Sequence, residues 1–344
     1  MSQPLELGLD TFGDVTRGPD GAPRSHAAVI REVVDQGVLA DELGLAFFGV
    51  GEHHRADFAV SAPEVVLAAL AARTSRIRLG SAVTVLSSDD PIRVFQRFST
   101  LDALSNGRAE AILGRGSFTE SFPLFGLELE DYERLFEEKL DLFAQLLKGG
   151  PVRWQGSVRP PLAVPGVYPE PEGDGFTAWI GVGGSPESVV RAARYGLPMM
   201  LAIIGGAPGR FRPYVDLYHR AVAEIGGAVR PLGVHSPGYV AETDEAARAE
   251  FFDDYRTMHA RIGAERGWPP LERAAFEREI EHGSLYVGSP ETVARKIAAT
   301  ASALGLSRFD LKYSAGPLPH DRLMRCIELY GGVVAPRVRE LLDA

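Results

Sequence analysis

The chain has 344 residues, of which 45% are hydrophobic and 24% charged, and its formal net charge is −10. This acidic balance, without any basic run interleaved with aromatic residues, argues against a partner that is nucleic acid or an anionic membrane, since both need basic patches. The lone cysteine, Cys326, excludes an internal disulfide and a cysteine-based metal site, and neither a signal peptide nor a membrane-length apolar run is present, so we expect a soluble, cytoplasmic protein.

Apolar runs and helix-like stretches alternate along the whole chain, in the order expected of repeated strand–helix units. We predict strands at 5–12, 45–51, 76–86, 108–114, 177–183, 197–204, 232–240 and 309–316. The clearest helical patterns lie at 26–44, 62–75, 186–196 and 290–305. The last two begin with Ser-Pro-Glu, in which serine caps free amides, proline fits the first turn and the acid lies near the positive helix end.

Eight such units predict a single α/β domain over 1–344, a (β/α)8 TIM barrel with insertions. A doubly wound open sheet is the alternative, but the DTFGDVTRG stretch after the first strand does not fit the G-x-G-x-x-G nucleotide fingerprint. Two stretches interrupt the alternation. Residues 149–176 are rich in Pro and Gly and indicate an insertion with little regular structure, and residues 251–283 indicate a mobile flap or extra helices.

The strongest local motif is GVGGSPES at 181–188, where a predicted strand breaks at Gly183 and Gly184. The helix that follows has free N–H groups at its start, and the hydroxyls of Ser185 and Ser188 lie beside them. The motif is either an anion site or an ordinary capped turn.

A second motif, GRGS at 114–117, lies at the end of another predicted strand and places Arg115 before Gly116 and Ser117. Arg115 is either a bidentate phosphate clamp or a surface salt-bridge residue. Because functional groups of a barrel gather at the carboxyl ends of its strands, the two motifs together favour a phosphorylated cofactor or substrate.

Two adjacent histidines, His53 and His54, follow the second predicted strand, in the sequence GVGEHHRADF (49–58). Neighbouring residues on a strand point to opposite faces, so the pair is a poor metal site, and we expect no metal. One inward-facing histidine is either an acid–base group or a structural strand-end residue, and Glu52 either orients a neighbour or caps the next turn.

The order of motifs resembles the luciferase-like monooxygenase family. The motifs that carry the resemblance are GEHHRADF (51–58), RIRLGSAVTVLSSDDPIRV (76–94), LDALSNGR (101–108), ILGRGSF (112–118), PLFG (123–126), YGLPM (195–199) and LPHD (318–321). The resemblance implies a barrel, usually dimeric, that binds FMN at its C-terminal face. Members of this family use reduced flavin, often supplied by a separate reductase, and O2 to form a flavin hydroperoxide that oxygenates a small organic substrate.

The resemblance also implies roles for individual residues. His53 matches the catalytic histidine, which hydrogen-bonds near the reacting flavin edge, and His54 is expected to be a supporting residue that faces the other way. Ala82 and Val83 align with a non-prolyl cis peptide bond that packs against the isoalloxazine. The positions implied for the FMN phosphate and its surroundings are Arg115, Gly116, Ser117, Gly183, Gly184, Ser185 and Ser188.

Two positions depart from the luciferases of this family. Gly114 stands where they carry a reactive cysteine on the fourth strand, which we expect to open space near the flavin, and light emission or use of long-chain aldehydes does not follow. Gly184 replaces an acidic residue beside the phosphate serine, and backbone amides do not need that side chain to bind phosphate.

A reactive flavin must be shielded from water, and 251–283 is the first candidate for a lid, with 149–176 as the second. Two other functions remain open. One is hydride transfer by a deazaflavin-dependent oxidoreductase of the same superfamily, and the other is flavin binding without catalysis.

Overall fold

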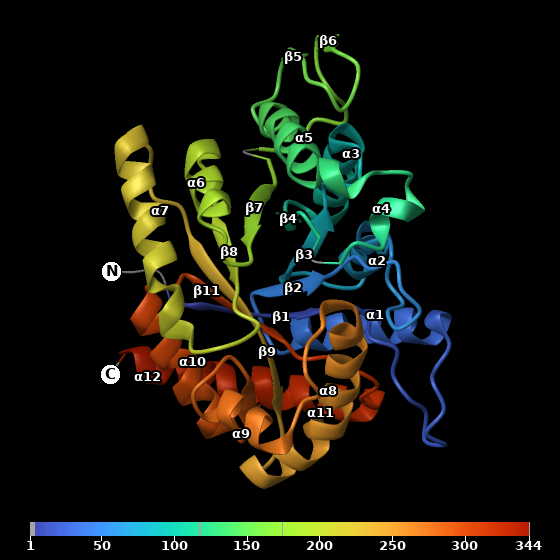
Figure 1. Cartoon of the computed structure of the whole chain (residues 1–344), viewed down its shortest axis with the longest axis vertical. Coiled ribbons are helices and arrows are strands. Elements are labelled where there is room, and N and C mark those ends of the chain that lie inside the picture. Colours follow the sequence, from blue (N-terminus) through green and yellow to red (C-terminus); the bar gives the residue numbers. More distant parts are fainter. Residues whose placement is uncertain (1–3, 117, 174, 344) are drawn as a thin grey trace.

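The computed structural model describes residues 4–116, 118–173 and 175–343, and Figure 1 shows a central barrel of strands surrounded by helices. Eight parallel strands follow the order β1-β2-β3-β4-β7-β8-β9-β11, and β11 pairs back with β1, which closes the barrel. The barrel strands are β1 (Glu6–Thr11), β2 (Phe47–Val50), β3 (Arg78–Val85), β4 (Ala109–Gly114), β7 (Thr177–Val182), β8 (Met199–Ala202), β9 (Leu232–Val240) and β11 (Arg308–Lys312). The predicted (β/α)8 TIM barrel is confirmed, and every predicted strand has its counterpart.

Helices connect the barrel strands and cover the outside of the barrel. They are α1 (His26–Glu42), α2 (Pro63–Ala71), α3 (Pro91–Ser105), α4 (Ser121–Leu124), α5 (Tyr132–Leu146), α6 (Pro186–Tyr195), α7 (Arg212–Ile225), α8 (Asp244–Arg266), α9 (Arg273–Glu281), α10 (Pro290–Leu304), α11 (His320–Leu329) and α12 (Ala335–Asp343). Three further turns are η1 (Leu129–Asp131), η2 (Pro208–Phe211) and the π-helical η3 (Tyr330–Val334). The two Ser-Pro-Glu starts behave as predicted, because Ser185 and Ser289 cap α6 and α10 with their side chains.

A short strand that the sequence did not predict, β10 (Tyr286–Gly288), lies beside the outer part of β9. Strand β9 is nine residues long, whereas β11 has five residues and pairs with it only as far as Pro237. The remaining residues of β9 are left without that partner, and β10 pairs with them in parallel. The length of β9 therefore explains the extra strand.

The insertion at 149–176 is more regular than predicted. Strands β5 (Val152–Trp154) and β6 (Leu162–Val164) form an antiparallel hairpin there, which projects beyond α5 in Figure 1. The hairpin is held to α5 because the Trp154 indole N–H donates to Asp141 at 3.1 Å. Most of 251–283 lies in α8 and α9, so the prediction of extra helices is confirmed.

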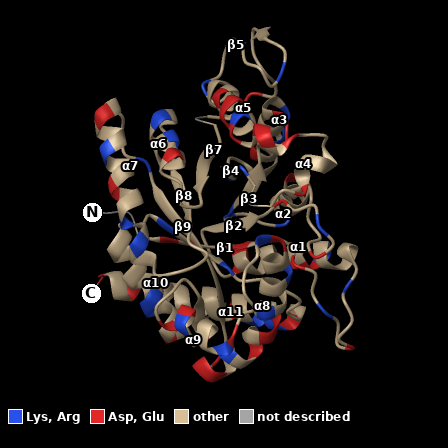
Figure 2. Cartoon of the chain, viewed as in Figure 1, with Lys and Arg blue, Asp and Glu red and all other residues tan. Residues whose placement is uncertain are grey.

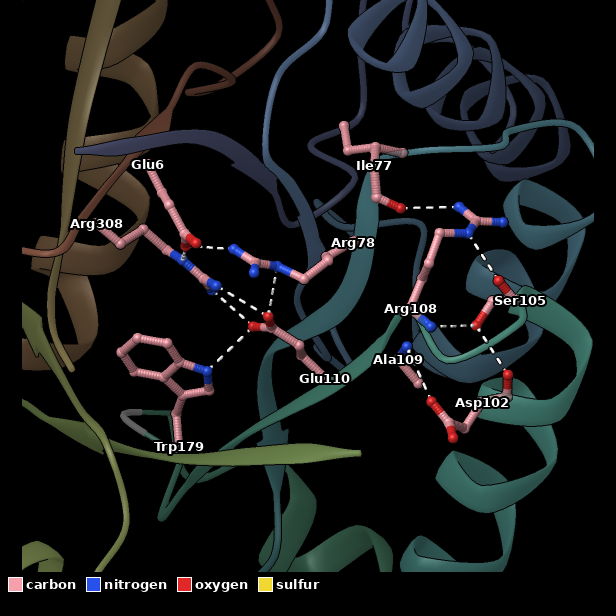
Figure 3. A network of polar contacts seen from close by, with 10 residues as sticks. All are labelled: Glu6, Ile77, Arg78, Asp102, Ser105, Arg108, Ala109, Glu110, Trp179 and Arg308. Carbon is pink, nitrogen blue, oxygen red and sulfur yellow. Dashed lines mark hydrogen bonds and ion pairs between the residues drawn. The ribbon is translucent and has the colours of Figure 1, made fainter. Parts of the chain in front are cut away.

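A layer of ion-paired side chains, centred on the buried Glu110 and Arg308, lies at the N-terminal end of the barrel (Figure 3). Glu110 accepts two hydrogen bonds from the Arg308 guanidinium, at 2.7 and 2.9 Å, and a third from the Trp179 indole at 3.0 Å. Arg78 pairs with the same carboxylate at 2.8 Å, and Arg308 also donates to Glu6 at 3.1 Å. Arg308 is 1% exposed and Glu110 3% exposed, so this end of the barrel is closed by ion pairs.

The charged residues on the outside are mixed in sign. In Figure 2 acidic and basic residues are interspersed along the helices, while the barrel strands are mostly uncharged. Over the described parts of the chain, no helix combines the length and the apolar character that crossing a bilayer requires.

Candidate functional site

A cavity of about 400 Å³ opens at the C-terminal ends of the barrel strands. Cavities of this size are typical of small-molecule sites. Of the residues predicted from the sequence, those that line it are His53, Ala82, Val83, Arg115, Gly116 and Gly183. Gly184, Ser185 and Ser188 are not among its lining residues, although they follow Gly183 directly at the start of α6. Ser117 lies outside the described residues.

His53 lies in the turn after β2 and is enclosed by aromatic rings. Its ring centroid is 4.4 Å from that of Phe58, 4.8 Å from Phe12 and 4.9 Å from Phe118. Its Nδ1 lies 3.4 Å from Glu120 Oε1. Burial alone would raise the pKa of Glu120, but the hydrogen bond to His53 and backbone amides outweigh it and hold this pKa below its ordinary value. The arrangement fixes the His53 ring beside an ionised carboxylate.

His54 lines the same cavity as His53, so the prediction that it faces the other way is wrong. Strand β2 ends at Val50, and the alternation of faces no longer applies in the irregular turn that follows. His54 Nε2 lies 2.9 Å from Glu52 Oε1, and this hydrogen bond raises the pKa of His54. Glu52 also accepts from the Val85 amide at 3.0 Å, so it orients its neighbour and ties the turn to β3.

The peptide bond between Ala82 and Val83 is cis, as predicted. The pairing of β3 with β4 shifts by one residue at this point. Gly114 on β4 lies against it, and a Cβ there would meet Val83 Cγ2 at 2.6 Å. The expectation that Gly114 opens space is therefore wrong, because the Val83 side chain takes the room that a side chain at 114 would need.

Two guanidinium groups flank one carboxylate beside the start of α6. Arg115 forms an ion pair with Glu133 Oε1, and Arg191 Nη2 lies 3.6 Å from Glu133 Oε2 and 3.6 Å from Glu137 Oε1. The Arg191 side chain is 7% exposed, and its buried Nε has no hydrogen-bond partner among the described residues. Glu133 is 60% exposed, so it is free to leave this position, whereas Arg191 is not.

The serine hydroxyls lie next to these cations. Ser185 Oγ accepts from the Ser188 amide at 3.2 Å and donates to Ser188 Oγ at 3.0 Å, and Arg191 Nη1 lies 3.4 Å from Ser188 Oγ. Gly184 has φ +111°, a conformation that side chains other than glycine's rarely adopt, and its carbonyl accepts from the Tyr214 hydroxyl at 2.7 Å. Arg191 was missed from the sequence because it reads as one more residue of an amphipathic helix.

A second histidine–carboxylate pair lines the same cavity, beyond the Phe12 ring that packs on both His53 and His235. His235 on β9 places Nδ1 2.6 Å from Oδ2 of Asp10 on β1. Asp310 on β11 is the register partner of His235, and all three residues line the cavity. Burial raises the pKa of Asp310 well above its ordinary value, and neither of its oxygens has a hydrogen-bond partner in the described structure. Asp10 and His235 were not singled out from the sequence, because no sequence pattern pairs residues that lie 225 positions apart.

Helix α8 and the turn after it contribute to the lining of the cavity. Tyr255, Met258, Ile262 and Trp268 line it, whereas no described residue of 149–176 does. The Arg266 guanidinium lies over the Trp268 ring at 5.4 Å and over the Phe118 ring, which packs on His53. The placement agrees with 251–283 as the first candidate for a lid.

A family model described as luciferase-like monooxygenase matches residues 11–308. The 4-hydroxyprotoasukamycin monooxygenase of Streptomyces nodosus subsp. asukaensis is 28% identical over 334 residues, which cover 88% of this chain and 85% of that protein.

Solved structures share the fold over almost the whole chain. Monooxygenase RslO1 from Streptomyces bottropensis has a TM-score of 0.84 at 22% identity and covers 96% of this chain and 99% of its own. The oxygenating constituent of 3,6-diketocamphane monooxygenase from Pseudomonas putida, in complex with FMN, has a TM-score of 0.78 at 19% identity. The match covers 98% of this chain and 99% of that chain. An F420-dependent secondary alcohol dehydrogenase, in complex with an F420–acetone adduct, has a TM-score of 0.76 at 15% identity. The match covers 98% of this chain and 99% of that chain.

Proposed function

The chain belongs to the luciferase-like monooxygenase family, and we propose that it is a flavin-dependent monooxygenase that uses reduced FMN and O2 to oxygenate a small organic substrate. The observation that carries the proposal is the convergence of three features on one cavity: the caged His53, the Ala82–Val83 cis bond and the cationic end at Arg115. FMN, when bound, supplies the electrons that activate O2 for transfer of one oxygen atom.

The residues beside α6 fit a phosphate group. Arg115 and Arg191 share the Glu133 carboxylate, an anion held between two guanidinium groups. The partnerless Arg191 Nε and the Ser188 hydroxyl add donors beside it, and the first amides of α6 face an anion favourably. We expect the phosphate to take the place of the exposed Glu133 carboxylate.

His53 is the expected proton-handling group at the reacting side of the cavity. Glu120 holds its Nδ1, which leaves Nε2 to donate or accept a proton. Phe12, Phe58 and Phe118 exclude water from the ring, and α8 with Trp268 would complete the enclosure. A homodimer, a separate flavin reductase and a cytoplasmic location are further parts of the proposal.

The decisive experiment supplies enzymatically reduced FMN and ¹⁸O2 to the purified chain together with a substrate panel. We expect product that carries a single ¹⁸O atom. Tight FMN binding without oxygenation of any substrate would instead favour a flavin-binding protein without catalysis. The fold shared with an F420-dependent dehydrogenase makes hydride transfer the second candidate. Parallel titrations with FMN and F420 separate the two, because the proposal requires the tighter binding to be that of FMN.

Replacing Arg191 with Met should weaken FMN binding at least about tenfold, because a buried charge-assisted contact to phosphate is lost. Riboflavin, which lacks the phosphate, should bind the variant and the unaltered chain alike. Fluorescence titration with both ligands measures the difference. Arg194→Met, on the same helix, is the matched control, and Glu133→Gln should bind FMN more tightly because the competing carboxylate charge is gone. Equal losses for FMN and riboflavin would contradict a phosphate role for Arg191.

A further inference from the structure

The Asp10–His235 pair lies in the half of the cavity that the cofactor site leaves open. The residues assigned to FMN come from β3, β4 and the end of β7, whereas Asp10, His235 and Asp310 come from β1, β9 and β11. In the closed barrel these two sets of strands face each other across the mouth. A substrate seated against the flavin would therefore meet the Asp10–His235 side.

The pair is built to present one imidazole nitrogen to a ligand. Asp10 is 1% exposed and holds His235 Nδ1 at 2.6 Å, which fixes the ring, and Phe12 stacks on that ring at 6.0 Å with an interplanar angle of 14°. An ionised carboxylate only accepts hydrogen bonds, so Nδ1 donates and Nε2 is left as the acceptor. Nε2 makes no hydrogen bond with any residue that the structure describes, and the His235 side chain, 13% exposed, lines the cavity.

The polar groups near His235 do not hydrogen-bond to its Nε2. Lys312 is held by Asp14 at 2.9 Å and by the Ser314 carbonyl. Asp10 Oδ1 and both oxygens of Asp310 are buried without partners among the described residues. Polar atoms left unpaired at the floor of a cavity are costly unless a ligand or water satisfies them.

The cavity that the pair faces is lined in part by apolar side chains and rings. They include Phe12, which stacks on the His235 ring, together with Met200, Pro237, Tyr255 and Met258. A ligand that fits both surroundings is largely apolar, carries an aromatic or comparable ring, and has one acidic hydroxyl group.

We propose that Asp10 and His235 form a substrate-side acid–base centre, separate from His53, which binds the hydroxyl of a phenol-like or enol-like substrate and accepts its proton. The O–H bond of the substrate breaks, the proton forms an N–H bond at His235 Nε2, and the electron pair stays on the substrate oxygen. Asp10 stabilises the resulting imidazolium without taking the proton. The proposal deepens the monooxygenase function and rests on it, because loss of the hydroxyl proton makes the substrate ring electron-rich and so a good acceptor of an electrophilic oxygen atom.

The test compares two probes that differ only in the acidic hydroxyl, 4-nitrophenol and 4-nitroanisole, by equilibrium dialysis against the chain with and without FMN. We expect 4-nitrophenol to bind at least about tenfold more tightly, and its bound form to show the absorbance of the phenolate. In His235→Asn, whose amide still reaches Asp10 but leaves nothing at the Nε2 position, this preference and the phenolate band should disappear. Binding of 4-nitroanisole should be unchanged, which shows that the cavity is intact.

His235→Gln is the companion variant, because its longer amide reaches the Nε2 position but cannot take up a proton; it should keep part of the preference and lose the phenolate band. A hydroxyl preference that survives in His235→Asn would overturn the proposal, and so would binding of neither probe to the unaltered chain. Retention of FMN is read in the same samples. Failure of FMN to bind counts against the monooxygenase function. The preference for 4-nitrophenol over 4-nitroanisole is also measured in the samples without FMN, so it tests the Asp10–His235 proposal independently.

Discussion

His53→Ala is expected to lower substrate turnover at least about a hundredfold, because general acid–base groups contribute about 10²–10⁴ to rate. The FMN dissociation constant should change far less, within about threefold, since the residues proposed for the phosphate lie on other strands. Single-turnover oxidation with pre-reduced FMN and fluorescence titration with oxidised FMN measure the two effects separately.

The informative result is a large loss of turnover without a matching change in the FMN dissociation constant. His282, whose side chain is 81% exposed, provides the matched control, and His282→Ala should change neither quantity. Equal losses in turnover and FMN affinity would make His53 a structural residue that holds Phe12, Phe58 and Phe118 in place. Glu120→Gln keeps the ring contact but removes the charge, so its turnover should lie between that of His53→Ala and the unaltered chain.

Glu110→Ala should lower the free energy of unfolding by about 3–5 kcal/mol, because it leaves the buried Arg308 guanidinium without its main partner. The remaining contact of Arg308, to Glu6, involves a carboxylate that is 33% exposed and compensates only weakly. Urea unfolding followed by circular dichroism measures the change.

Removing both charges is the control for this ion pair. The double variant Glu110→Leu with Arg308→Met should recover more than half of the loss, because no uncompensated buried charge remains. Arg325→Ala breaks an ion pair with Glu242 in which both side chains are more than half exposed, and it should change stability by no more than about 0.5 kcal/mol. A loss for Glu110→Ala no larger than for Arg325→Ala would mean that the barrel floor does not depend on its charges.

The barrel could be predicted from the sequence because its evidence is local. Each strand is a short apolar run, and the starts of α6 and α10 are set by Ser185 and Ser289 within four residues of sequence. Strand β10 could not be predicted, since three residues carry no periodicity and their pairing depends on how far β9 extends past β11.

Part of the cavity lining was anticipated at the ends of the predicted strands, whereas contacts between residues distant in sequence were missed. The signals for His53 and Arg115 lie in their own motifs, and the Ala82–Val83 cis bond follows from the family resemblance. The pairing of Asp10 with His235, and of Glu133 with two arginines, exists only after the strands have closed. His54 was placed wrongly because the exact residue at which β2 stops decides which way the next side chains point.

The ion pair between Glu110 and Arg308 closes the N-terminal end of the barrel, and the cavity opens at the C-terminal end. A ligand that enters from the C-terminal end to reach Asp10 passes the residues of α8 that line the cavity, and we expect it to leave in the same direction. We therefore expect ordered binding and release, in which a ligand bound deep in the barrel dissociates only after the ligand bound nearer the opening has left. The ion pairs at the closed end of the barrel thus influence the order in which ligands bind and leave at the open end, although they contact none of these ligands.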